Sequence, residues 1–274
     1  MQAEYMEPIT IAESGAVPMI SDDRFALFTK WRIGAFGRKL REICEDESFD
    51  ELTFEEKVEL CIDAELTARD SRKVEKAARS ARFKIKGACV EEIYYLPDRT
   101  LSRDRIARLA SCGWIEAREN LVIISESGGG KSYIAQALGV AACRNLMSVR
   151  YVRLNDMFRE LNVARTEDRY YEALDRFSKP DLLILDDFFT TPVENPLNAV
   201  DLFEILEARE GRASTLIASQ LEPDQWYLRI NSDLCADSIL NRVVEHARFL
   251  DIKGPNMREY TASLKATEEK GYWD

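Results

Sequence analysis

The sequence is poor in histidine and has no closely spaced cysteines, and these two shortages exclude several kinds of site. Its single histidine, His246, disfavours histidine-based metal centres and Ser-His-Asp catalysis. The six cysteines are scattered with no CxxC pair, which is typical of reduced thiols and disfavours a zinc site. We therefore expect a cytoplasmic protein whose chemistry depends on other residues.

Long apolar runs are also missing. No stretch approaches the roughly 18 to 20 uncharged apolar residues that span a membrane. The N-terminal MQAEYMEPIT lacks the basic start and apolar run of a signal peptide. With 46% hydrophobic and 32% charged residues, the 274-residue chain can form one large domain or two modest ones. The composition excludes a disordered chain, and we expect no membrane partner.

Acidic residues outnumber basic residues by 49 to 38, which gives a net charge of −11 that is not typical of nucleic-acid binding. The positive charge is concentrated in residues 66–86, which contain eight basic and two acidic residues. A helix predicted to begin at the capping-box spacing of Thr53 and Glu56, and to end near Lys86, carries a stripe of basic residues at helical spacing. This basic stripe comprises Arg69, Arg72, Lys73, Lys76 and Arg79. It is either a solvated face or a surface that follows the phosphates of duplex DNA.

Composition and hydrophobic periodicity divide the chain into three parts. Residues 1–22 have the prolines and Ser-Gly pair of a loose tail, and residues 23–98 have helical periodicity. From residue 99 onward, apolar runs alternate with helical stretches, which predicts an α/β domain with a parallel five-stranded sheet covered on both faces. The expected strands are 121–124, 149–152, 182–185, 215–218 and 249–252, and the expected helices are about 131–145, 155–177, 198–210 and 236–247.

The first predicted strand runs into SESGGGKS, residues 125–132, which we call the phosphate loop. It matches GxxxxGK[ST] at every fixed position but the first, where Ser125 replaces glycine. The loop amides and the following helix would hold phosphate oxygens, Lys131 would reach the β- and γ-phosphates, and Ser132 would ligate Mg²⁺. The predicted nucleotide-binding residues are Ser125, Glu126, Ser127, Gly128, Gly129, Gly130, Lys131, Ser132 and Tyr133.

The third predicted strand ends in two acids, in the sequence LLILDD. We expect Asp186 to reach the Mg²⁺ ion and Asp187 to orient or deprotonate the attacking water. Gln220, after the fourth strand, either senses the γ-phosphate or holds the attacking water, or it belongs to an ordinary turn. Arg242 either serves a neighbouring subunit's nucleotide in trans or forms a surface ion pair.

These segments together resemble the IstB-like ATP-binding proteins, the AAA+ transposition helpers of insertion sequences, and the related DnaC-type helicase loaders. The resemblance is carried by SESGGGKS, LLILDDF, STLIASQL with Trp226, and ILNRVVEHARFLDIKG, and it extends over about residues 30–258. It implies an AAA+ P-loop NTPase without a lid domain, preceded by a small all-α domain. It places Gln220 at the sensor-1 position and Arg242 at the arginine-finger position.

The resemblance further implies ATP and Mg²⁺ as cofactors, an ATP-dependent oligomer, and duplex DNA and a DDE transposase as partners. A DnaC-like helicase loader is the nearest alternative, since it shares fold and motifs. Ser125, Glu126 and an aspartate at 187 also leave open a scaffold that holds ATP with little hydrolysis. A small-molecule P-loop kinase is a third interpretation, but it needs an arginine-bearing lid that the sequence does not show.

Overall fold

The computed structural model describes residues 20–230, 233–245 and 247–270. The predicted tail up to residue 19 and His246 therefore lie outside the described residues. The chain forms two compact units, Met1–Arg72 and Lys73–Asp274. The predicted domain boundary at residue 98 stays a prediction; Ala77, Ala78 and Ala81, which precede it, already pack in the core of the second unit. Among the described residues, no helix is both long and apolar enough to cross a bilayer.

The described part of the first unit is helical. Its buried residues include Ala35, Ile43 and Cys61. A buried carboxylate, Glu65, accepts hydrogen bonds from the amides of Ala35 and Phe36 at 3.0 and 3.3 Å. Both amides lie in the first turn of the helix α2, whose own N-cap residue provides no side-chain hydrogen bond. Glu65 therefore satisfies amides that would otherwise lack a partner. The elements are α1 (Asp22–Lys30), α2 (Gly34–Glu45), the 3₁₀ turn η1 (Glu47–Phe49) and the first part of α3 (Phe54–Ala81).

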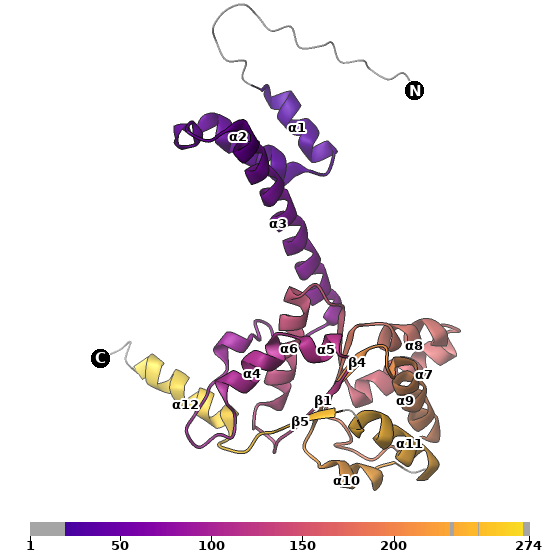
Figure 1. Cartoon of the computed structure of the whole chain (residues 1–274). Helices are drawn as coiled ribbons and strands as arrows, with labels where there is room; N and C mark the ends of the chain where they lie inside the picture. The colour runs from indigo at the N-terminus through magenta and orange to yellow at the C-terminus, as the bar shows by residue number, and fades with distance from the viewer. Residues whose placement is uncertain (1–19, 231–232, 246, 271–274) are drawn as a thin grey trace, which may run out of the picture. The chain divides into compact units, whose positions relative to one another are not determined.

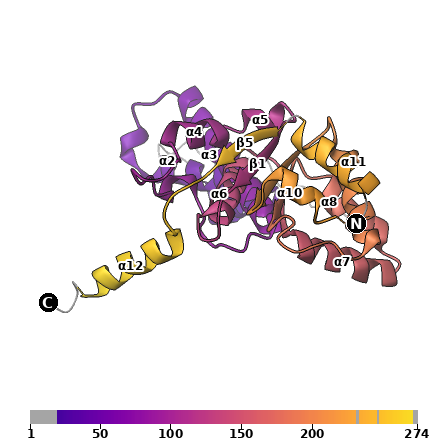
Figure 2. The same ribbon diagram turned by 90° about the horizontal axis from the view of Figure 1, so that it is seen from below.

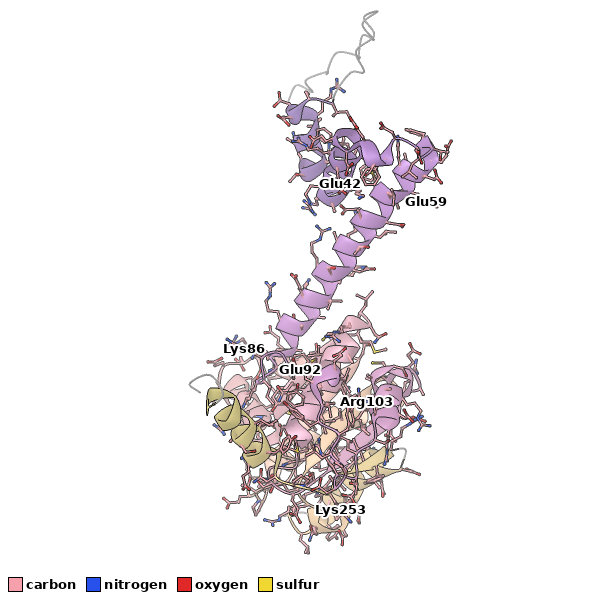
Figure 3. The ribbon with its side chains drawn as sticks, turned by 90° about the vertical axis from the view of Figure 1, so that its left-hand side faces the viewer. Glu42, Glu59, Lys86, Glu92, Arg103 and Lys253 are labelled. Atoms are coloured by element: carbon pink, nitrogen blue, oxygen red, sulfur yellow. The ribbon has the colours of Figure 1, made fainter. Side chains whose placement is uncertain are left out.

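The helix α3 begins at the predicted capping box. The Thr53 amide donates to the Glu56 carboxylate at 2.8 Å, and the Glu56 amide donates to the Thr53 hydroxyl at 3.3 Å. The helix ends at Ala81, and the predicted end near Lys86 is wrong because Arg82 adopts a left-handed conformation with φ of 59°. Figure 3 shows the side chains of α3 between the labelled Glu59 and Lys86.

The second unit is built on a parallel sheet in the order β2-β3-β4-β1-β5. Alternate residues of each strand face opposite layers, as Leu121 and Ile123 show on one face and Val122 and Ile124 on the other. Figures 1 and 2 show α4–α6 on one side of the sheet and α7–α11 on the other. The strands are β1 (Asn120–Ile124), β2 (Val149–Arg153), β3 (Leu182–Asp186), β4 (Ser214–Ser219) and β5 (Ala247–Asp251).

The predicted sheet is confirmed, and the differences lie in the connections. The stretch 155–177 forms two helices, since Asp168 has φ of 55° between them. After β5, the described residues form one helix, α12, which the sequence did not predict, and they form no helical lid. The remaining elements are η2 (Val90–Glu92), α4 (Arg103–Ala110), α5 (Gly113–Glu116), α6 (Lys131–Arg144), α7 (Leu154–Thr166), α8 (Tyr170–Ser178), α9 (Pro196–Arg209), α10 (Pro223–Tyr227), α11 (Asp233–Val244) and α12 (Met257–Lys270).

Glu65→Gln tests the cap of α2. Burial alone would raise the pKa of Glu65, but hydrogen bonds from Arg69, two amides and Arg72 outweigh it, so the pKa lies below its ordinary value. We expect the variant to lower the opening free energy of residues 34–45 at pH 7 by roughly 1–3 kcal/mol, measured by hydrogen exchange. Because a lowered pKa stabilises only above the unfolded value of about 4.3, acidification through the folded pKa should erase the difference.

Glu75→Gln, which removes an exposed carboxylate from the same helix, is the control. Equal exchange in wild-type protein and Glu65→Gln at pH 7 would contradict the role of Glu65.

Candidate nucleotide site

The site lies where three neighbouring strands end. Strand β4 lies between β1 and β3, so the phosphate loop after β1, the acidic pair at the end of β3 and Gln220 after β4 meet at one edge of the sheet. The carboxyl edge of a parallel sheet is where such folds bind ligands. The topology thus brings together three groups that are up to 95 residues apart (Ser125 to Gln220) in the sequence.

The phosphate loop has the backbone shape that its glycines permit. Gly128 and Gly130 have φ of 86° and 91°, a region that other residues rarely adopt. Gly129 has no room for a side chain because the Ser125 hydroxyl occupies the space where its Cβ would lie. The buried Ser125 Oγ has no hydrogen-bond partner among the described residues. An unsatisfied polar atom inside this loop fits a site that a polar ligand completes.

Lys131, the first residue of α6, is buried with 6% of its surface exposed. Burial lowers the pKa of Lys131, the carboxylates of Asp186 and Asp187 raise it, and Arg258 lowers it further. A buried ammonium is costly without a counter-charge, so a phosphate group is a suitable partner here. Glu126, by contrast, is exposed, so its carboxylate stays hydrated.

Asp186 joins the phosphate loop to the third strand. Its Oδ1 accepts hydrogen bonds from Ser132 Oγ at 3.0 Å and from the Asp187 amide at 2.9 Å. Its Oδ2 accepts one from Tyr151 at 2.7 Å. The hydroxyl and carboxylate oxygens of Ser132 and Asp186 are hard oxygen ligands, the type that Mg²⁺ prefers, and they are already adjacent. The residues present therefore fit a Mg²⁺ ion bound together with nucleotide phosphates.

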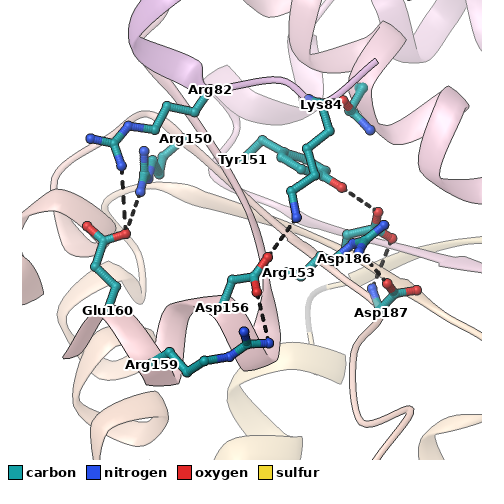
Figure 4. A network of polar contacts seen from close by, with 11 residues as sticks. Arg82, Lys84, Arg150, Tyr151, Arg153, Asp156, Arg159, Glu160, Asp186 and Asp187 are labelled. Atoms are coloured by element: carbon teal, nitrogen blue, oxygen red, sulfur yellow. Dashed lines mark hydrogen bonds and ion pairs between the residues drawn. The ribbon is translucent and has the colours of Figure 1, made fainter. Parts of the chain in front are cut away.

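Asp187 lies in a left-handed conformation with φ of 52°. Its Oδ2 lies 3.2 Å from the Nε of Arg153. Arg153 is the last residue of β2 and so lies at the same edge of the sheet. An aspartate tolerates this backbone shape better than most residues, at a modest cost. The structure thus places Asp187 directly after Asp186 and in an ion pair with Arg153 (Figure 4).

The Ser-Gln pair after the fourth strand has two separate roles. Ser219 Oγ donates to the Phe188 carbonyl at 2.9 Å and accepts from Trp226 Nε1 at 3.0 Å and the Leu221 amide at 3.0 Å. It therefore fastens the loop after Asp187 to β4. Gln220 is half-buried at the same edge, and its side chain makes no hydrogen bond within the described part of the chain.

Arg242 pairs with carboxylates of its own chain. It lies 3.1 Å from both Glu207 of α9 and Glu210, the residue just after α9, and its guanidinium stacks over Phe203 at 4.5 Å. In a single subunit the structure thus matches the ion-pair alternative, and a role in trans stays a prediction.

Some residues of the basic stripe form ion pairs within the protein and others do not. Arg69 and Arg72 bind the buried Glu65 at 2.9 and 3.1 Å. Lys76 and Arg79 are exposed, and neither forms an ion pair with any carboxylate that the structure describes. Part of the predicted DNA surface therefore serves the fold of the first unit.

Sequence reasoning missed four residues at the site: Arg99, Tyr151, Arg153 and Asn256. Buried Arg99 donates to the carbonyls of Gly129 at 2.7 Å and Tyr94 at 2.8 Å, so it braces the phosphate loop. Asn256 lies against Gly128, and the Met257 amide donates to the Gly128 carbonyl at 2.8 Å. No local pattern marks these residues, because each is distant in sequence from the loop. Tyr133 instead contacts Cys89 and Glu92, away from the loop.

A phosphate loop after β1, an acidic pair at the end of β3 and the sheet order give this unit the fold of the AAA+ P-loop proteins. The model of the IstB-like ATP binding protein family matches residues 28–265. The chain belongs to that family.

Two relatives illustrate the match. An insertion sequence ATP-binding protein of Sinorhizobium fredii, y4pL, is 37% identical over 217 residues, which are 79% of this chain and 88% of that protein. The insertion sequence IS1162 ATP-binding protein of Pseudomonas fluorescens is 34% identical over 203 residues, 74% of this chain and 87% of that protein.

Solved structures share the fold at low identity. The crystal structure of DnaI has a TM-score of 0.51 and 23% identity, covering 62% of this chain and 90% of that one. AMPPCP-bound DnaA from Aquifex aeolicus has a TM-score of 0.54 and 18% identity, covering 68% and 56%. The DnaC helicase loader has a TM-score of 0.52 and 16% identity, covering 61% and 98%.

Arg99→Ala tests the brace on the phosphate loop. Loss of two hydrogen bonds from a charged donor removes about 1.5 kcal/mol or more of preorganisation. We expect the Kd for ADP with Mg²⁺, measured by calorimetry, to rise about 10-fold. Arg118→Ala removes an arginine bonded to the Gly211 carbonyl and should leave the Kd unchanged. An unaltered Kd in Arg99→Ala would exclude the bracing role.

Proposed function

We propose that the protein is an ATP-dependent transposition helper that binds ATP with Mg²⁺, hydrolyses it, oligomerises on duplex DNA and recruits or activates a DDE transposase. The observation that carries the ATPase part is the 3.0 Å hydrogen bond between Ser132 of the phosphate loop and Asp186 of β3. Membership of the insertion-sequence family supports the transposition part.

The chain's own residues divide the work. The phosphate loop and Lys131 hold the β- and γ-phosphates, and Ser132 and Asp186 hold the Mg²⁺, which would neutralise charge on the phosphates. Asp187 accepts the proton of the attacking water or orients it. Gln220, at the adjacent strand end, is placed to report the presence of the γ-phosphate. Asp187 must first leave its pair with Arg153.

An oligomer would complete the site through Arg242. Its present partners, Glu207 and Glu210, are more than half exposed, whereas the Arg242 side chain is 21% exposed. If a neighbouring subunit's nucleotide replaced them, both carboxylates would remain in contact with water. The exposed Lys76 and Arg79 support non-specific contact with DNA phosphates.

Two alternatives have support of their own. The DnaI and DnaC folds keep a helicase-loader role open, and a pull-down with a transposase against one with a replicative helicase separates the two. The Arg153–Asp187 pair favours slow hydrolysis, as in a scaffold that holds ATP.

Lys131→Ala and Asp187→Asn separate binding from hydrolysis. We expect Lys131→Ala to lose detectable ATP binding in calorimetry, because its ammonium is the buried partner of the phosphates. Asp187→Asn should bind ATP within about 3-fold of wild-type affinity but release phosphate at least about 100-fold more slowly. If wild-type protein binds ATP and releases phosphate no faster than Asp187→Asn, the scaffold interpretation holds.

A second experiment tests the DNA surface. Replacing both Lys76 and Arg79 with Ala should weaken binding equally for unrelated duplex sequences and reduce the salt slope by up to about 0.9 per lost phosphate contact. The control replaces Arg169 and Lys179, the two exposed cations that flank α8, with Ala. It changes the net charge by the same amount as the Lys76 and Arg79 variant. Identical salt slopes in the two variants would remove Lys76 and Arg79 from the DNA surface.

A further inference from the structure

Tyr151 is a buried polar side chain whose role the proposed reaction does not include. It lies in β2, only 2% of its surface is exposed, and its hydroxyl donates to Asp186 Oδ2 at 2.7 Å (Figure 4). Burial, together with the charge of Asp186, raises the pKa of Tyr151 far above its ordinary value. Because a carboxylate oxygen can only accept, the phenol is the donor in this 2.7 Å hydrogen bond.

The hydrogen bonds of Asp186 divide between its two oxygens. Oδ1 accepts from Ser132 and from the Asp187 amide, on the side of the phosphate loop. Oδ2 has Tyr151 as its hydrogen-bond donor among the described residues. Asp186 is only 1% exposed, so water has little access to replace a missing donor. The phenol thus fixes the rotation of the carboxylate and with it the direction of Oδ1.

Tyr151 is itself held by the segment that follows α3. The ring of Phe83, two residues beyond the end of α3, lies 6.5 Å from the Tyr151 ring. Phe83 has little freedom, because it and Ile184 fill the space where a Gly139 side chain would lie. The next two amides, of Lys84 and Ile85, donate to Gln136 Oε1 at 2.7 and 2.8 Å.

Gln136 connects the same segment to the other side of the site. It is buried on α6, and its Nε2 donates to the Ser132 carbonyl at 3.1 Å. Residues 83–85 therefore contact both the helix that carries Ser132 and the phenol that holds Asp186. These are the two residues that the proposed function assigns to Mg²⁺.

Resting on that proposed function, we propose that Tyr151 is a positioning residue that orients Asp186 for the divalent cation, and that Phe83 acts on the cation site through Tyr151. Partners that orient a metal ligand typically change metal affinity 10- to 100-fold when they are removed. The effect belongs to the cation and not to the nucleotide alone, because the Tyr151 hydroxyl donates to Asp186 and, among the described residues, to no residue of the phosphate loop.

Tyr151→Phe removes only the hydroxyl. In the full-length chain, fluorescence of bound mant-ADP is titrated with MgCl₂, starting from EDTA. We expect the Mg²⁺ concentration at half-maximal response to rise roughly 10-fold, while mant-ADP affinity in EDTA stays within about 2-fold of wild type. Tyr170→Phe is the matched control, because it removes a hydroxyl that donates to Asp201 at 2.9 Å and is not part of the site. Its Mg²⁺ midpoint should equal that of the wild type.

An unchanged Mg²⁺ midpoint in Tyr151→Phe would overturn the proposal. So would an equal loss of mant-ADP affinity in EDTA and in Mg²⁺, since that pattern indicates a general role in the fold. Wild-type protein that binds no mant-ADP at any Mg²⁺ concentration would contradict the proposed function instead.

Phe83→Leu tests the second part. We expect it to raise the Mg²⁺ midpoint about 3-fold with Tyr151 present and to have no further effect in the Tyr151→Phe background, as for residues that act through one contact. Equal effects in both backgrounds would show that Phe83 does not act through Tyr151.

Discussion

The nucleotide site depends on one buried carboxylate, that of Asp186. A charge at the end of a buried strand is costly unless donors surround it, and here three donors do so. They come from α6, β2 and the backbone after β3, through Ser132, Tyr151 and Asp187. The same contacts that make the charge tolerable also fix the phosphate loop to the third strand, so the fold and the site share one set of hydrogen bonds.

Charge balance explains why a divalent cation fits this arrangement. Near the phosphate loop, Lys131 and Arg153 lie close to Asp186 and Asp187, and Arg99 and Arg258 add further positive charge. A triphosphate adds several negative charges to that balance, and both acids would repel it. A divalent cation, which Asp186 and Ser132 would hold, would offset this repulsion.

The sequence predicts those parts of the site that are encoded locally. The phosphate loop and the Asp186–Asp187 pair each follow an apolar strand within a few residues, so pattern and spacing suffice. Arg99 and Asn256 reach the loop from connections 26 or more residues before it and over 100 residues after it, and no periodicity marks them. The early end of α3 at the left-handed Arg82 is likewise unmarked in the sequence, because the segment that follows is held by tertiary contacts with Gln136 and Gly139.

Charges counted along the sequence differ from charges that are available for binding. The basic stripe contains five cations, but Arg69 and Arg72 are engaged by Glu65, which is needed to cap α2. Arg242 is likewise engaged, by Glu207 and Glu210, although these partners are solvated and can be exchanged. The two cases differ in burial: releasing Arg69 and Arg72 would leave a buried carboxylate with fewer partners, whereas releasing Arg242 exposes two carboxylates that already contact water. The exposure of its two partners is thus the feature that supports the proposed role of Arg242 in trans.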